Sequence, residues 1–291
     1  MQEAIMSISE QMQALSISPS RLRQSYRDHA QNPVGNFALF EAVRDELLHL
    51  DVHVEESRIS PTDFEEWLLS WPEVTDFYRQ YGQVAIEKCL EHYLSTRECR
   101  LQTGDVLVDV AAAGSPYAQA LNNRGITAYS LDLSYPPGMH GSRIGADATQ
   151  SGLPNAFADA LTLHCAYECF MGDADTLLLS EAARILKPGG RLFITPLYID
   201  DSFYNITSPF CDQVNVKIDP GAERVWRDDQ WKEPFSRHYS ATAFVERVWS
   251  QLPNSLSGTI LFHSCIPQLM SRYPGQTIYC LFALLCRKAM D

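Results

Sequence analysis

The chain has 291 residues, a formal net charge of −13 at pH 7 and 45% hydrophobic residues. This length predicts one sizeable globular core with a smaller helical region, and the composition excludes a repeat array. The acidic balance argues against nucleic acid as a partner, because nucleic-acid binders need a basic patch. We therefore expect a small-molecule substrate, and the sequence leaves the oligomeric state open.

Targeting signals and metal motifs are missing from the sequence. The N-terminus has no basic stretch followed by an apolar core, and the longest apolar run, Ile278 to Cys286, is too short for a bilayer. The eight cysteines form no CxxC pair, which favours buried reduced thiols over a zinc site. We expect a cytoplasmic protein with no bound metal and no membrane contact.

Residues 1–100 are predicted to form a helical cap region. Apolar residues recur there at helical spacing in two groups, Phe37, Phe40, Val43, Leu47 and Leu50, and then Ile86, Cys89, Leu90, Tyr93 and Leu94. The segment Ser60 to Asp63 predicts a helix start with Ser60 as its N-cap. The aromatic stripe of Phe64, Trp67 and Trp71 is typical of core packing, and the alternative is that it roofs a substrate pocket.

From residue 101 to the C-terminus the sequence predicts the main α/β domain. Four β-rich runs alternate with helical segments there: Val106–Val110, Thr127–Leu131, Ala160–Leu163 and Arg191–Leu197 are the runs, and Tyr117–Asn123 and Asp175–Leu186 are the helices. This alternation predicts a mostly parallel sheet with covering helices.

The C-terminal third departs from this alternation. The last two runs, Thr259–Cys265 and Thr277–Leu285, leave no room for a helix between them, so an antiparallel pair at the edge of the sheet is expected. Residues 199–257 are aromatic and rich in charge, with one helical pattern near Ala241–Leu252. We predict that they form a lid insertion.

Three motifs follow one another in the α/β domain. A loop of small residues, 111–116, follows the first strand and precedes a helix, so that backbone N–H groups can approach a carboxylate. Asp132 ends the second strand 23 residues after Asp109, where a Rossmann-type fold binds ribose hydroxyls. Finally, the run Leu186-Lys187-Pro188-Gly189-Gly190 ends a helix and turns into a new strand.

With these motifs, the segment from Thr103 to Leu197 resembles the class I methyltransferases that depend on S-adenosylmethionine (SAM). The specific part comprises Asp132, Gly145-Ala146-Asp147-Ala148, Leu153-Pro154, Phe157-Ala158-Asp159-Ala160 and Ala182–Leu192. The resemblance implies SAM as cofactor and a Rossmann-like, seven-stranded, mostly parallel sheet whose last strand is reversed.

The first loop departs from the family's Asp/Glu-x-Gly-x-Gly-x-Gly pattern. Ala111, Ala113 and Ser115 occupy the glycine positions, and alanine tolerates positive φ poorly, so a different loop path is expected. Ser115 and Pro116 can begin the helix and leave its dipole free for the methionine carboxylate. The departure also leaves open an alternative, a catalytically inactive SAM-fold protein that acts as a binding or scaffold partner.

By position in the family's motifs, Asp132 would bind the ribose, Asp147 would meet the adenine amino group, and Ala148 would lie beside the ring. The residues expected to bind the cofactor are Asp109, Ala111, Gly114, Ser115, Asp132, Leu133, Asp147, Ala148 and His164. Taken alone, Asp132 also fits a strand-end turn and Asp147 a solvated loop.

The end of the fourth strand lies where this family approaches the methyl group, so His164, Tyr167 and Glu168 are the expected catalytic residues. Methyl transfer needs alignment and exclusion of water, and a hydroxyl nucleophile also needs a base. The alternatives are a hydrogen-bonded structural His164 and a Glu168 that faces solvent.

The lid insertion interleaves aromatic residues with Arg and His, a mixture that can bind a sugar, a carboxylate or a phosphate. The expected substrate-binding residues are Trp226, Trp231, Arg237, His238 and Tyr239. The alternative is a lid that packs on the sheet with its charges solvated.

The lid and the N-terminal helices are expected to close a pocket over His164 and Glu168. Its lining would include some of Trp67, Trp71, Trp226, Trp231, Phe235 and Tyr239. The predicted function is methyl transfer from SAM to an O or N atom of a small molecule, such as a sugar or a secondary metabolite.

Overall fold

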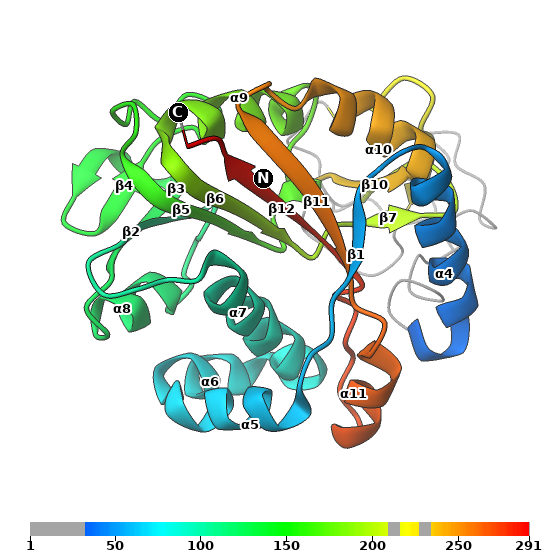
Figure 1. Ribbon diagram of the computed structural model, residues 1–291, viewed down its shortest axis with the longest axis horizontal. Helices are drawn as coiled ribbons and strands as arrows, with labels where there is room; N and C mark the ends of the chain where they lie inside the picture. The colour runs from blue at the N-terminus through cyan, green and yellow to red at the C-terminus, as the bar shows by residue number, and fades with distance from the viewer. Residues whose placement is uncertain (1–32, 209–215, 227–233, 291) are drawn as a thin grey trace, which may run out of the picture.

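In the computed structural model, residues 33–208, 216–226 and 234–290 are described. The central sheet has eight strands in the order β1-β11-β12-β6-β5-β2-β3-β4 (Figure 1). They are β1 Val54–Glu56, β2 Val106–Val110, β3 Thr127–His140, β4 Arg143–Gly145, β5 Ala158–His164, β6 Leu186–Thr195, β11 Leu256–Phe262 and β12 Phe282–Lys288. Strands β2 to β6 are parallel, whereas β12 is antiparallel to both neighbours. The Rossmann-like sheet with a reversed last strand is confirmed.

The edge of the sheet beyond β11 differs from the expected one. Strand β1, from the N-terminal region, pairs with β11 in parallel and makes an eighth strand at this edge. The antiparallel pair of β11 and β12 is confirmed, but a helix, α11 (Ile266–Arg272), lies between them. The expectation of no helix was wrong because the residues between the two predicted runs, 266–276, are enough for the seven-residue α11.

Helices cover both faces of the sheet (Figure 1). Those of one face are α5 Pro61–Ser70, α6 Pro72–Tyr78, α7 Ala85–Cys99 and α8 Tyr117–Asn122, and those of the other are α9 Ala174–Ile185 and α10 Ala241–Arg247. Helix α4 (Pro33–His49) lies beside α10 and α11. The predicted start of α5 is confirmed, since the Ser60 hydroxyl accepts a hydrogen bond from the Asp63 amide at 3.2 Å. Among the described residues, the search for a helix that could cross a bilayer finds none.

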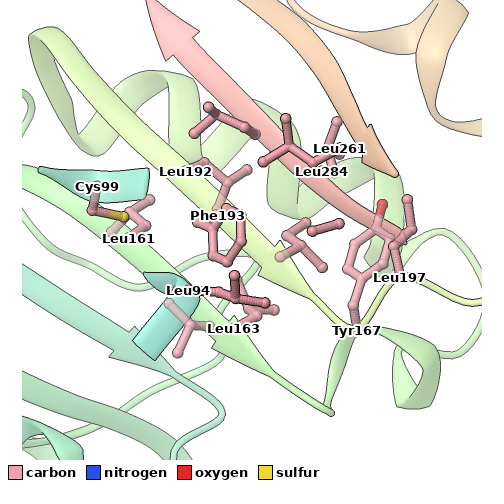
Figure 2. Packing of buried hydrophobic residues seen from close by; sticks show 14 of the residues in the cluster. Leu94, Cys99, Leu161, Leu163, Tyr167, Leu192, Phe193, Leu197, Leu261 and Leu284 are labelled. Atoms are coloured by element: carbon pink, nitrogen blue, oxygen red, sulfur yellow. The ribbon is translucent and has the colours of Figure 1, made fainter. Parts of the chain in front are cut away.

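The N-terminal helices and the sheet share one hydrophobic core. Figure 2 shows Leu94 and Cys99 of α7 near Leu161 and Leu163 of β5 and Phe193 of β6. The expected aromatic stripe belongs to the same core. Its rings Trp67 and Trp71 are 8% and 7% exposed and stack with centroids 5.0 Å apart. The alternative that they roof a pocket is wrong, because α5 and α6 bury them against α7 and α8.

The segment predicted as a lid forms a second, smaller sheet. Its strands are β7 Ile199–Asp200, β8 Tyr204–Thr207, β9 Glu223–Trp226 and β10 Ser236–Ser240, in the order β7-β10-β8-β9. Helix α10 follows β10 directly and is capped by the Ser240 hydroxyl, which accepts from the Ala243 amide at 3.1 Å. In the described part of the insertion, these four strands therefore precede α10, which lies in the place of the single predicted helix.

Candidate active site

Two adjoining cavities lie at the carboxyl ends of the parallel strands, where ligands bind in open α/β sheets. The larger has a volume of about 680 Å³ and the smaller about 190 Å³. Both are lined by Ala111 and Ala113, in the loop after β2, and by Cys165, directly after β5. A ligand that passes this loop can therefore occupy both cavities.

In the loop after β2, two alanines adopt the left-handed backbone that favours glycine. Ala111 and Ala113 have φ of 54° and 44°, in the left-handed region that costs an L-residue roughly 1–2 kcal/mol. The expectation of a different loop path, drawn from alanine's poor tolerance of positive φ, is therefore wrong at these two residues. The Ala113 amide donates to Asp132 Oδ2 at 2.8 Å, which ties the loop to β3; this strand continues to His140, beyond the end predicted at Asp132.

One end of the larger cavity brings together four residues expected around ribose and adenine. Asp132, Leu133, Asp147 and Ala148 all line it. The Asp147 carboxylate is oriented by the Thr149 amide and hydroxyl, which donate to Oδ1 at 2.8 and 2.7 Å. The Ser134 and Thr149 contacts also fit the alternatives, a strand-end turn for Asp132 and a loop charge for Asp147, so both roles stay predictions.

The smaller cavity is lined by the other expected cofactor residues, Asp109, Gly114, Ser115 and His164. Asp109 is 1% exposed, and its Oδ1 contacts His164 Nδ1 at 2.9 Å. Asp109 Oδ2 has no hydrogen-bond partner in the described protein. His164 Nε2 lies 2.6 Å from the Ser95 hydroxyl, so both ring nitrogens are engaged within the protein. This geometry favours the structural alternative for His164, which orients Asp109.

A polar face of α7 completes the smaller cavity, and the sequence reasoning missed it. Lys88 and Glu91 line the cavity, and Lys88 Nζ donates to Glu91 Oε1 at 2.8 Å. Glu87 and His92 are also buried. Burial, with Glu91 as a neighbour, raises the pKa of Glu87 to about 8, while burial holds the pKa of His92 well below its usual value. Charges spaced along a helix usually mark a solvated face, but here α7 is covered by both the sheet and α5–α6.

The other end of the larger cavity holds Glu168, on the turn after β5. Its side chain is buried, Oε1 accepts from the Cys165 thiol at 3.4 Å, and Oε2 has no partner in the described protein. Burial raises the pKa of Glu168 to about 7. The expected alternative, a Glu168 that faces solvent, is wrong. Cys165 itself has φ of 49°, a strained backbone of the kind found at functional sites.

Residues that the sequence reasoning missed form the walls around Glu168. They are Phe170, Met171, Tyr198, Ser236 and Tyr279. With Glu168 and the expected His238, which also lines the cavity, we call this set the acceptor compartment. Tyr198 and Tyr279 come from loops without a recognisable motif, so only their position after β6 and before β12 could have pointed to them.

The remaining candidates lie outside both cavities. Tyr167 is buried and its hydroxyl donates to the Asp175 carbonyl at 3.2 Å, so a catalytic role for it does not fit. Tyr239 donates to Asp175 Oδ2 at 2.7 Å behind the acceptor compartment. The buried Trp226 does not line either cavity, and Trp231 lies outside the described residues.

Arg237 was expected to bind substrate, but it is fully buried in an ion-pair network. Its Nε donates to Asp219 Oδ2 at 2.6 Å, and Nη1 lies 2.9 Å from Asp175 Oδ2. The alternative of solvated charges is therefore wrong for Arg237, while the charges at 227–233 lie outside the described residues. The expected pocket lies under the insertion and the N-terminal helices. However, none of the five described aromatic residues predicted to line it does so, namely Trp67, Trp71, Trp226, Phe235 and Tyr239.

Comparison with known proteins gives a family for the central part of the chain. Residues 108–194 match the methyltransferase domain family. No curated protein sequence matches the chain.

Solved structures of methyltransferases are similar at low identity. The 1,6-didemethyltoxoflavin-N1-methyltransferase of Burkholderia thailandensis is 13% identical over 81% of this chain and 94% of that one, with a TM-score of 0.45. A SAM-dependent methyltransferase of Methanosarcina mazei is 13% identical over 66% and 95%, with a TM-score of 0.39. A protein of Anabaena variabilis ascribed to antibiotic biosynthesis is 20% identical over 37% of this chain and only 44% of its own, with a TM-score of 0.32.

Proposed function

We propose that the chain, whose residues 108–194 match the methyltransferase domain family, transfers the methyl group of SAM to an oxygen or nitrogen atom of a small molecule. The observation that carries this proposal is the junction of the two cavities at Ala111, Ala113 and Cys165. Ala111, Ala113 and Cys165 would contact a long cofactor that occupied both cavities, and the acceptor compartment belongs to the larger of them.

The charges around the cavities fit SAM. We propose that Asp132 and Asp147 accept hydrogen bonds from the ribose and the adenine in the larger cavity. In the smaller cavity, Asp109 Oδ2 and Glu91 Oε2 are buried oxygens without partners, which is costly unless a ligand satisfies them. An α-ammonium group would do so, and Lys88 lies beside them for the carboxylate. When bound, SAM supplies an electrophilic methyl group on a good leaving group.

The protein's part in the reaction is to align the acceptor, exclude water and accept a proton. We propose Glu168 as the catalytic base, since it is buried in the acceptor compartment with one free carboxylate oxygen. His164 is proposed as a positioning residue that fixes Asp109 through its 2.9 Å contact. His238 shapes the opposite wall beside Tyr198, with ring centroids 4.7 Å apart.

We propose that residues 1–100 act as a cap and residues 199–257 as a cover for the acceptor. Support comes from Val84 of the first region and from Ser236 and His238 of the second, which line the larger cavity.

We also propose a cytoplasmic location and no nucleic-acid partner. The cysteines among the described residues are free thiols, as is usual in a reducing compartment. The net charge of −13 disfavours binding to a phosphate backbone.

Two measurements on the purified full chain test the proposed function. Calorimetric titration should show binding of both SAM and its demethylated product, S-adenosylhomocysteine (SAH). Incubation with methyl-labelled SAM and a small-molecule extract should then transfer label to the extract, and heat-denatured protein serves as the control. Absence of binding to SAM and SAH would contradict the proposal, as would binding without transfer to any small-molecule fraction.

A further inference from the structure

The acceptor compartment has walls that suit an apolar or aromatic body. Phe170, Met171, Tyr198 and Tyr279 line it. The rings of Tyr198 and Tyr279 are nearly parallel, with centroids 6.2 Å apart and planes at 23°. Such faces bury apolar surface and also attract cations through their negative π-faces.

The acidic residues that line the larger cavity disfavour an anionic acceptor. Its described lining contains three carboxylates, Asp132, Asp147 and Glu168, and neither lysine nor arginine. Arg237, on the neighbouring strand β10, is held by Asp219 and Asp175. An acceptor with a carboxylate or phosphate would therefore meet the buried Glu168 with no lysine or arginine among these lining residues to compensate it, which is unfavourable.

The Glu168 carboxylate can bind a hydrogen-bond donor of the acceptor molecule in this compartment. Its Oε2 is buried and unpaired, while the thiol of Cys165 contacts Oε1. Among the described residues, Lys88 is the cation whose charge acts on Glu168. Its ammonium donates to Glu91 at 2.8 Å, and Glu168 Oε2 stays without a hydrogen-bond partner in the described protein.

We propose that the acceptor is a small amine carried on an aromatic or other apolar body, and that Glu168 binds its ammonium group. This inference rests on the proposed function and narrows the acceptor atom to nitrogen. The ammonium gives one proton to the Glu168 carboxylate. The freed lone pair then forms the N–C bond to the methyl group while the C–S bond breaks, and its electron pair stays on sulfur. The products are the methylated ammonium, SAH and one proton, which Glu168 releases to water.

Proton transfer also favours an amine over an alcohol. Burial raises the pKa of Glu168 to about 7, and an ammonium group with a pKa of roughly 10 is within reach of such a base. An alcohol is a far weaker acid and would need a stronger base. A phenol has a similar acidity to the ammonium, but it brings no positive charge to the acidic cavity.

The test uses three fragments of one size that differ in charge. The full chain, saturated with SAH, is titrated with phenethylamine, 4-ethylphenol and 3-phenylpropionate at pH 7.5. Phenethylamine should bind at least ten-fold more tightly than either of the others. In Glu168→Gln its affinity should fall at least ten-fold while SAH affinity is unchanged. Glu246→Gln, the same change at an exposed position of α10, is the control and should bind as the wild type does.

Several results would overturn the inference: tighter binding of 3-phenylpropionate, equal binding of the amine and the phenol, no binding of the amine, or an unchanged amine affinity in Glu168→Gln. The ranking of the three fragments on the wild type decides the question even if the variant does not fold. If SAH itself does not bind, the proposed function fails as well. If SAH binds and the ranking is wrong, only the amine inference fails.

Discussion

Acidic side chains at the site differ in how much of each carboxylate the protein already uses. Asp132 accepts from the Ala113 amide on Oδ2 and from the Ser134 amide and hydroxyl on Oδ1, so it is fixed before a ligand arrives. Asp109 and Glu168 each keep a buried oxygen without a partner. The first arrangement gives preorganised binding, and the second gives sites that a ligand must complete.

Replacement of Asp132 by alanine should weaken SAH binding by one to two orders of magnitude. The ribose would lose charge-assisted hydrogen bonds worth roughly 1.5–3 kcal/mol. Asp132→Asn keeps a hydrogen-bond acceptor without the charge, so its SAH affinity should lie between those of the wild type and Asp132→Ala. Asp45→Ala, at an exposed position, is the control and should bind SAH as the wild type does. Calorimetric titration measures the affinities. An unchanged affinity in folded Asp132→Ala would remove the ribose assignment.

Strain in the loop after β2 can be relieved by restoring a glycine. Ala113 has φ of 44°, which glycine adopts freely, so Ala113→Gly should raise the free energy of unfolding by about 0.5–1 kcal/mol. Ala120→Gly, in the interior of α8, is the matched control and should lower it by about 1 kcal/mol or more. Urea denaturation measures both. Destabilisation by Ala113→Gly would show that the loop is not strained there.

Among the elements, the second sheet depends on a buried ion-pair network. Arg237 of β10 joins Asp219, which precedes β9, to Asp175 of α9, and Arg247 of α10 lies 3.0 Å from the same Asp175. The Arg237 guanidinium also donates to the carbonyls of Phe170 and Gly172, at 2.7 and 2.8 Å. The network therefore anchors the acceptor compartment to the main sheet.

Loss of Arg237 should act on stability and leave cofactor binding unchanged. Arg237→Met leaves Asp219 and Asp175 buried with less compensation and should lower the free energy of unfolding by about 3–5 kcal/mol. The double variant Arg237→Met with Asp219→Asn should recover part of this loss, because one of the uncompensated charges is gone. Urea denaturation gives the stabilities and titration the SAH affinity of the folded fraction. Unchanged stability of Arg237→Met together with a lower SAH affinity would contradict this structural role of Arg237.

The molecule as a whole buries an unusual set of ionisable groups between α7 and the sheet. Glu87 and Glu91 are nearly inaccessible, and each has an oxygen without a partner in the described protein. Burial raises the pKa of Glu87 from 4.5 to about 8. Between these values the folded state binds more protons than the unfolded state, so the contribution of Glu87 to stability falls as pH rises from 4.5 to 8.

The variant Glu87→Gln should therefore gain stability over the wild type as pH rises. The difference should be smallest at pH 5 and largest at pH 8, since glutamine needs no proton to remain neutral. Buried histidines such as His263, with its pKa lowered by burial to about 3, act in the opposite direction below about pH 6.5. The wild type and Glu87→Gln share this histidine contribution, so it cancels when their free energies of unfolding are subtracted at each pH. Urea denaturation of both proteins at pH 5 and pH 8 measures the difference in stability. The same difference at both pH values would contradict the prediction.

The fold and the cofactor end of the site follow from local sequence features. The strands after Gly104 alternate with helices. Asp132 follows the part of β3 that pairs with β2, and Asp147 comes two residues after β4, so both lie near the carboxyl edge of the parallel sheet. Such features depend on periodicity and turn residues, which a sequence displays directly.

The acceptor end was decided by tertiary packing. Nothing local distinguishes Arg237, buried among carboxylates, from a solvated arginine, or the buried Glu91 from a helix-surface charge. Burial depends on which elements cover a face; here α5 and α6 pack on α7, and β10 packs on the turn that holds Glu168. Long-range packing therefore set the desolvation that gives these side chains their chemistry, and the sequence alone determined only where the sheet would present its carboxyl edge.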